Sequence, residues 1–209
     1  MAVIALCAAA ATAAFWVQGR DGSPAKTPAA AEPSVTQRPS VPPGSSQPAT
    51  TTPAAQASVG APVRVRVDAV RLDAEVVPTA SVGGAFDPPS LTRAYWIEAF
   101  GAPGAESDNT VYLIGHSWDN GDAVFNPLFD RATQTSRVEP GDTVVVTTDA
   151  GEVTYEVERA ERIPREEVAQ EDNEVWDVVP GRLLLVTCFQ NNGGGDAFDN
   201  FVVFAHVLR

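Results

Sequence analysis

The distribution of apolar and polar residues separates an N-terminal stretch with no packing pattern from a domain of short alternating segments. From residue 61 onward apolar residues recur at every second position, as in Val63-Arg64-Val65-Arg66-Val67. A period of two is typical of a half-buried β-strand. The expected strands are 63–67, 74–77, 110–114, 142–148, 153–157, 183–188 and 202–208. Many short strands of this kind predict an all-β domain, either a sandwich or a barrel.

Turn residues and a few helical patterns complete this outline. Glu139-Pro140-Gly141 precedes the strand at 142–148, and Asp149-Ala150-Gly151 is typical of a hairpin turn. Helical periodicity is sparse. Short helices are expected around 94–100, 126–131 and 165–170.

The first sixty residues predict two further parts of the chain. Residues 2–17 are apolar and uncharged, although the segment is shorter than the roughly 20 residues that span a bilayer as a helix. We interpret 1–17 as a signal anchor, a transmembrane segment whose true start lies upstream, with a secretory signal peptide as the alternative. Residues 18–60 are rich in Pro, Ala, Ser and Thr and predict a disordered linker. The folded domain is then 61–209.

Charge and composition exclude several classes of function. The formal net charge is −13, which argues against nucleic-acid binding, because that requires a basic surface. The oxygen-rich segments 119–122 and 191–196 do not have the spacing of an EF-hand loop, and turn chemistry explains them better. No phosphate-binding loop or zinc cluster is present in the sequence. We expect no metal and no cofactor.

The best candidate for chemistry is a cysteine and a histidine that each end an apolar strand. Cys188 closes the run Leu183–Cys188 beside a glycine-rich loop, and His116 follows the strand 111–114 directly after Gly115. Together they have the composition of a thiolate–imidazole nucleophile. The alternative for Cys188 is a small buried hydrophobe. The other histidine, His206, lies between apolar residues of the last strand and is expected to be structural.

Four segments, in the expected order, resemble the motifs of sortases. Val186-Thr187-Cys188 resembles the Thr-Leu-x-Thr-Cys signature, with Leu184 in place of the first threonine, and Leu113-Ile114-Gly115-His116 resembles the strand that carries the family's histidine. Residues 123–128 are similar to the family's Gly-x-Phe-x-x-Leu segment, and 139–142 to its Gly-Asp turn. The resemblance covers 61–209 and is nearest to the actinobacterial sortases of classes E and F.

The resemblance implies a closed β-barrel of about eight strands with short helices, and a cysteine transpeptidase at the cell surface. Cys188 would attack the threonine carbonyl of a C-terminal LPxTG-like sorting motif and form a thioacyl intermediate. His116 would act as general acid and then as base. The implied partners are surface proteins with sorting signals, and an amine from a cell-wall precursor or a pilin lysine. The N-terminal anchor would hold the enzyme in the cell membrane with its catalytic domain outside.

One position departs from the family pattern. Sortases carry an arginine early in the last strand, where Asn200 stands in this chain. Either Asn200 replaces it as an oxyanion or substrate-positioning group, with Thr187 as a second candidate, or a distant arginine such as Arg131 reaches the site, or activity is reduced. The alternative functions are therefore a thiol hydrolase and a catalytically weakened barrel that binds surface-protein peptides.

Overall fold

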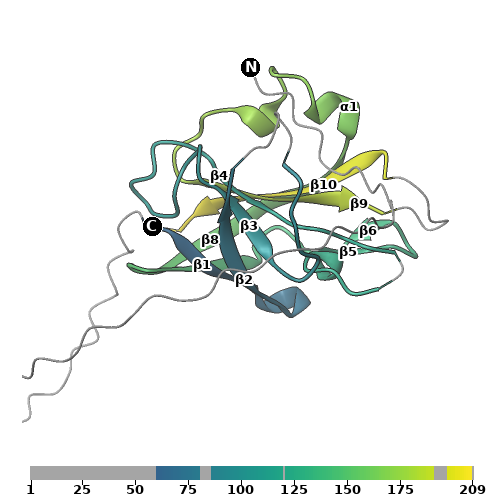
Figure 1. Cartoon of the computed structure of the whole chain (residues 1–209), viewed down its shortest axis with the longest axis horizontal. Coiled ribbons are helices and arrows are strands. Elements are labelled where there is room, and N and C mark those ends of the chain that lie inside the picture. Colours follow the sequence, from purple (N-terminus) through teal and green to yellow (C-terminus); the bar gives the residue numbers. More distant parts are fainter. Residues whose placement is uncertain (1–59, 81–85, 120, 191–196, 209) are drawn as a thin grey trace, which may run out of the picture. The chain divides into compact units, whose positions relative to one another are not determined.

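The computed structural model describes residues 60–80, 86–119, 121–190 and 197–208, and most of its strands close into one barrel (Figure 1). The barrel strands, in the order of their pairing, are β1 (Pro62–Val67), β2 (Leu72–Thr79), β3 (Ala94–Ile97), β4 (Val111–Ile114), β9 (Arg182–Phe189), β10 (Asp199–Val207), β8 (Gly151–Pro164) and β7 (Thr143–Thr148). The remaining elements are a small sheet of β5 (Phe129–Asp130) and β6 (Thr135–Ser136), the helix α1 (Arg165–Val168), and the 3₁₀ turns η1 (Asp68–Val70), η2 (Asn126–Leu128) and η3 (Glu174–Trp176). The expected all-β barrel of about eight strands with short helices is confirmed.

Two pairs of neighbouring strands in the barrel are parallel. They are β2 with β3, and β4 with β9, whereas the other barrel pairs are antiparallel. Parallel strands end at the same edge of a sheet, so the residues that follow β4 and β9 emerge side by side. This edge holds both residues that the sequence singles out.

Strand β9 is buried on both faces. Leu183, Leu185 and Phe189 belong to the cluster that fills the barrel. Leu184 and Val186 belong to a second cluster on the outer face, where Val168 of α1 and Val175 of η3 cover the sheet. Burial on both faces explains why this strand is a continuous apolar run instead of an alternating one.

The sequence-based expectation of a helix over 94–100 is wrong. Ala94–Ile97 forms strand β3, which pairs with β2 and β4. Tyr95, Trp96 and Ile97 are aromatic or β-branched, and such residues pack well on a pleated surface. The helix expected over 126–131 is present only in its first half, as the 3₁₀ helix η2, which passes directly into β5. The helix expected near 165–170 is present as α1.

The expected division of the N-terminal part stays a prediction. The proposed anchor 1–17 and almost all of the proposed linker 18–60 lie outside the described residues. Among the residues that are described, no helix has the length and apolar character needed to cross a membrane. The first barrel strand begins at Pro62, close to the boundary expected from composition.

Candidate active site

The parallel pairing of β4 with β9 brings His116 beside Cys188. Ile114 is the Cα partner of Val186, and the Gly115 amide donates to the Val186 carbonyl at 3.1 Å. The ladder thus continues past the end of β4, and His116 comes next to Cys188 two residues later. Side chains in a strand alternate between faces, so both residues lie on the outer face that carries Ile114 and Val186.

Asn200 completes a row across three strands. It is the Cα partner of Cys188 in the antiparallel pair of β9 and β10. The histidine, the cysteine and the asparagine therefore lie on adjacent strands and on one face. Thr187 falls on the opposite face, with the interior residues Leu185 and Phe189, and its hydroxyl has no hydrogen-bond partner. The structure brings together three of the four candidate residues and separates the Thr187 side chain from them.

The imidazole of His116 is fixed by the segment between β2 and β3. Its Nε2 lies 2.6 Å from the carbonyl oxygen of Pro88. Because a carbonyl only accepts hydrogen bonds, Nε2 carries the proton, and the lone pair of the neutral ring is on Nδ1. Pro88 and Phe86 are both buried, and Phe86 packs in the apolar cluster of the outer face. This anchoring holds the carbonyl in place.

The residues next to His116 and Cys188 bind each other through the backbone. The Ser117 hydroxyl donates to the Cys188 carbonyl, and the Gln190 side-chain amide donates to the Ser117 carbonyl at 3.0 Å. These contacts tie the end of β9 to the loop after β4. Relative motion of His116 and Cys188 is thereby restricted, as a nucleophile and its base would require.

A second set of contacts shapes the loop after His116. The Asn126 side chain accepts from the Trp118 amide at 2.8 Å and donates to the Gly121 carbonyl at 2.8 Å. Arg131 donates to the Trp118 carbonyl at 3.2 Å. Arg131 therefore supports the loop that follows His116.

Burial distinguishes the members of the row. Cys188 is 0% exposed and Asn200 is 1% exposed, whereas His116 is half-buried. The Asn200 side-chain oxygen Oδ1 has no hydrogen-bond partner. A buried polar atom without a partner costs free energy, so an unsatisfied Oδ1 on the residue paired with Cys188 favours a site that a bound group completes.

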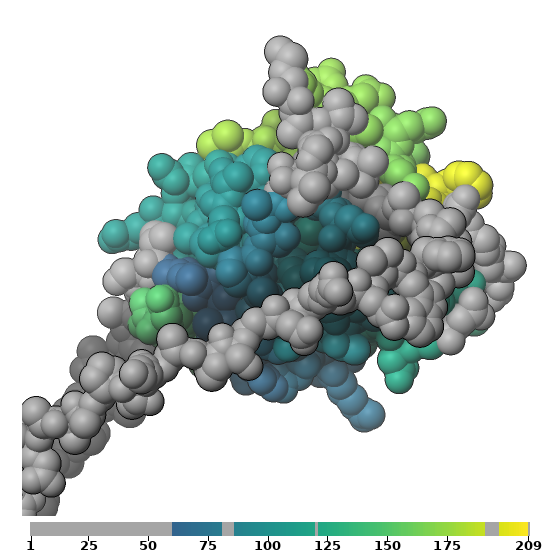
Figure 2. Space-filling model, in the orientation of Figure 1, coloured from purple at the N-terminus to yellow at the C-terminus, as the bar shows by residue number. Residues whose placement is uncertain are grey.

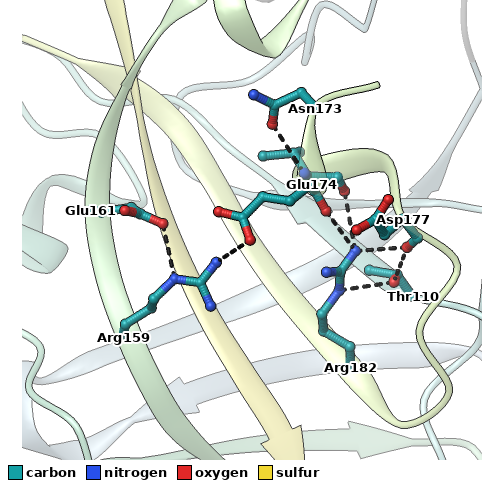
Figure 3. Close-up of polar contacts among 8 residues, drawn as sticks. Thr110, Arg159, Glu161, Asn173, Glu174, Asp177 and Arg182 are labelled. Atoms are coloured by element: carbon teal, nitrogen blue, oxygen red, sulfur yellow. Dashed lines mark hydrogen bonds and ion pairs between the residues drawn. The ribbon is translucent and has the colours of Figure 1, made fainter. Parts of the chain in front are cut away.

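The segment between β8 and β9 is attached to the outer face by Arg182. This buried guanidinium donates to the carbonyl oxygens of Glu174 at 3.0 Å and Asp177 at 2.6 Å, and to the Thr110 hydroxyl at 3.0 Å (Figure 3). Thr110 in turn donates to the Asp177 carbonyl at 2.8 Å. In the space-filling view the green atoms of this segment lie against the teal atoms that lead into β4 (Figure 2). Arg182 thus holds the segment between β8 and β9 against the outer face of the sheet, the face on which His116, Cys188 and Asn200 lie.

Tyr112 makes a second attachment of the same segment. Its hydroxyl donates to the Val175 carbonyl at 2.6 Å, and its ring stacks on Trp176 with centroids 5.4 Å apart. Burial raises the pKa of Tyr112 to about 12, because the phenolate is disfavoured away from water. The phenol therefore stays a hydrogen-bond donor at neutral and mildly alkaline pH.

Several residues that hold the site have no signal in the sequence. Pro88 contributes only a backbone carbonyl, and Ser117 is one of many loop serines. Arg182 begins an apolar strand next to Gly181, whose φ of 75° marks a tight turn. An arginine is unusual at the start of a buried apolar strand. This is the one feature of the sequence that indicates a structural role for Arg182.

Replacing Gly115 by alanine is expected to destabilise the fold by about 1–3 kcal/mol through overpacking and to lower activity. A Cβ at this position would lie 2.9 Å from carbons of the buried Phe125 ring and 2.7 Å from Val124. The displaced backbone carries His116. Denaturant unfolding and peptide turnover measure the two effects. Gly121→Ala is the matched control, because no atom lies within 4 Å of its added Cβ; equal effects of the two substitutions would contradict the prediction.

Comparisons with known proteins agree with this fold. The family model for the sortase domain matches residues 65–208. Solved structures with a similar fold include sortase C1 from Streptococcus suis (19% identity, TM-score 0.53, covering 74% of this chain and 74% of that one) and sortase A from Listeria monocytogenes (18%, 0.50, 71% and 88%). Sortase A from Corynebacterium diphtheriae is similar over 75% of this chain and 63% of its own, at 16% identity and a TM-score of 0.51. No curated protein matches.

Proposed function

Because the chain belongs to the sortase family, we propose that it is a cell-surface transpeptidase whose nucleophile is Cys188. The family implies a cysteine transpeptidase, and the observation that supports these particular residues is the row formed by His116, Cys188 and Asn200 on three adjacent strands. The closeness to classes E and F stays a prediction.

In the proposed first half-reaction the Cys188 thiolate adds to the threonine carbonyl of an LPxTG-like sorting motif. A carbon–sulfur bond forms, and the π-electron pair of the carbonyl moves to oxygen. Collapse of this oxyanion breaks the bond to the glycine nitrogen. The departing amine takes the proton that His116 carries on Nδ1, while Nε2 stays bound to Pro88. The product is a thioacyl enzyme.

In the second half-reaction an amine replaces the thiol. The incoming amine attacks the thioester carbonyl and transfers a proton to Nδ1 of His116, and the thiolate leaves as the amide forms. Thiolate and imidazolium are thereby restored. A cell-wall precursor or a pilin lysine is the proposed amine, and surface proteins with C-terminal sorting signals are the proposed acyl donors. An anchor at 1–17 would hold the domain outside the cell membrane.

The second candidate is a catalytically weakened barrel that binds the same peptides. It is favoured by Asn200, which takes the place of an arginine and is only 1% exposed. A thiol hydrolase is the other alternative, with water in place of the amine. Thiol labelling under reducing conditions separates enzyme from binder, and product analysis with and without added amine separates transfer from hydrolysis.

The direct test is mass spectrometry of the reduced intact protein after incubation with a library of sorting-motif peptides. We expect one adduct on Cys188, with a mass increase equal to the peptide acid up to and including its threonine, less one water. Addition of an amine such as triglycine should discharge it as a peptide product.

The matched control is Cys188→Ala, which removes the thiol and keeps a small apolar side chain in the strand. It should bind peptide and form no adduct. An adduct on this variant, or none on the wild type with any peptide in the library, would overturn the proposal.

A further inference from the structure

We propose that Gln134, in the turn of the β5–β6 hairpin, is a positioning residue that fixes the end of β9 and thereby sets the geometry of His116 and Cys188. This inference rests on the proposed function, because it concerns the base and the nucleophile of that reaction. It follows from the backbone conformation of Gln134, from its side-chain contacts and from the rigidity of its hairpin.

The backbone of Gln134 has a conformation that glutamine rarely adopts. Its φ is 58°, in the left-handed region that glycine occupies at no steric cost. A residue strained in this way persists only where the surrounding structure imposes the conformation. Glycine would form the same turn more easily, so the presence of a glutamine points to a role for its side chain.

The Gln134 side chain ties the hairpin to the end of β9. Its Nε2 donates to the Arg131 carbonyl at 2.7 Å within the hairpin and to the Gln190 carbonyl at 3.2 Å. Gln190 follows Cys188 by two residues, and its own side chain donates to the Ser117 carbonyl at 3.0 Å. The hairpin lies beside the end of β9 (Figure 1). Gln190 thus connects the hairpin to the loop after β4.

A further contact joins the same side chain to the two neighbouring strands. The Arg162 guanidinium of β8 lies with Nη1 3.5 Å from Oε1 of Gln134. It also pairs with Asp199 of β10 and lies over the Phe189 ring. Asp199 precedes Asn200 in the chain. Gln134 therefore contacts β9 directly and is linked to β10 through Arg162, at the edge of the barrel where the row lies.

The hairpin is held rigidly enough to fix this position. Asp130 accepts from Arg137 at 2.9 Å, and from the amides of Ala132 and Thr133 at 2.8 and 3.2 Å. Arg137 and these two amides lower the pKa of Asp130 to about 2, so the carboxylate stays ionised at neutral pH. Phe129 of β5 is buried in the cluster that fills the barrel. The turn is therefore braced from within and anchored to the core.

Loss of the Gln134 side chain should act on the chemical step. A nucleophile and its base need a defined separation, and a misplacement of about 1 Å can lower a rate by about 10²-fold. The contacts of Gln134 are with the chain itself and lie behind the end of β9. We therefore expect its loss to lower kcat and to leave the KM for peptide nearly unchanged.

The test compares Gln134→Gly with Arg71→Gly in turnover of a sorting-motif peptide that labels the wild type. Arg71 also has a positive φ, of 56°, but it is exposed and lies between β1 and β2, away from the strands of the row. Both substitutions relieve the backbone, so both variants should unfold near the wild-type temperature. We expect kcat to fall by about 10–10² for Gln134→Gly and by less than about threefold for Arg71→Gly.

Gln134→Glu is the second variant. It keeps the length of the side chain and the strain of the backbone, and it replaces the donor Nε2 by an oxygen that cannot donate to the Gln190 carbonyl. Its kcat should fall as in Gln134→Gly. If Gln134→Gly does not fold, Gln134→Glu decides by the same comparison.

The pH profile of Cys188 alkylation by iodoacetamide, measured under reducing conditions, is the readout that a purely structural role would not move. A displaced imidazole stabilises the thiolate less, so the profile should shift to higher pH in Gln134→Gly and stay in place in Arg71→Gly. Normal kcat in Gln134→Gly, an equal fall in Arg71→Gly, a rise in KM alone, or a fall in kcat with an unchanged alkylation profile would overturn the role of Gln134 and leave the proposed function standing. Absence of any adduct on the wild type would overturn both proposals.

Discussion

Replacement of His116 by alanine is expected to lower peptide transfer by about 10²–10⁴, the usual contribution of a general acid–base group. In the proposed mechanism the imidazole stabilises the thiolate of Cys188 and protonates the leaving amine from Nδ1, so its loss affects both steps. The iodoacetamide rate at Cys188 should fall as well, because less thiolate is present at neutral pH. Peptide turnover and mass spectrometry of the alkylated protein measure the two effects.

The matched control is His206→Ala, at the other histidine of the chain. His206 lies near the far end of β10, opposite Arg182 at the start of β9, and away from the row. We expect this variant to keep its turnover within about threefold, as most surface and half-buried changes cost little stability. A His116→Ala enzyme that transfers peptide at the normal rate would exclude His116 from the chemistry. Equal losses in both variants would indicate destabilisation instead of catalysis.

The alternation of apolar residues was sufficient to predict most of the barrel. Strands β1, β7, β9 and β10 begin and end within three residues of the expected bounds. Alternation of apolar and polar residues is a local property of a strand, and it is present in any fold that buries one face of the sheet. The apolar run that ends in Cys188 is buried on both faces, so its identification as a strand rested on length and composition and not on alternation.

Strand β3 was missed and strand β8 was predicted only over 153–157, for physical reasons that lie outside the local pattern. The aromatic segment Ala94–Ile97 has no clear period, and its parallel pairing with β2 over Val76–Thr79 decides its structure. Strand β8 runs from Gly151 to Pro164 although six of its 14 residues are charged. Strand β8 is stabilised by pairing with β7 along one part and with β10 along the other. The sequence of β8 alone does not show which strands it pairs with.

The candidate site likewise has features that the local sequence predicts and features that depend on strand pairing. Cys188 and His116 were recognisable because each ends an apolar strand, but only the register between β4 and β9 shows that they are neighbours. Pro88 contributes its backbone carbonyl, and the hydrogen bond from the Gly115 amide to the Val186 carbonyl continues the ladder past the end of β4. Such contributions depend on which strands pair, and a sequence read segment by segment cannot give that.

Replacing Arg182 by methionine is expected to lower the free energy of unfolding by about 3 kcal/mol, because hydrogen bonds from a charged donor contribute about 1.5–3 kcal/mol each. The carbonyl oxygens of Glu174 and Asp177 both accept from this guanidinium (Figure 3). For a domain of this size the midpoint of thermal unfolding should fall by roughly 6–12 °C. Calorimetry or circular dichroism measures the shift.

Arg93→Met is the control for removal of an arginine charge. Arg93 pairs with Glu75 at 3.0 Å on the surface, with side chains 50% and 57% exposed, and exposed pairs contribute about 0–1 kcal/mol. Its midpoint should therefore stay within roughly 4 °C of the wild type. Arg182→Lys should lie between the two, because an ammonium cannot reach acceptors on both sides as the planar fork does. If Arg182→Met and Arg93→Met shift the midpoint equally, Arg182 does not hold the segment between β8 and β9 in place, and the cover of the outer face must depend on Tyr112 and its apolar contacts instead.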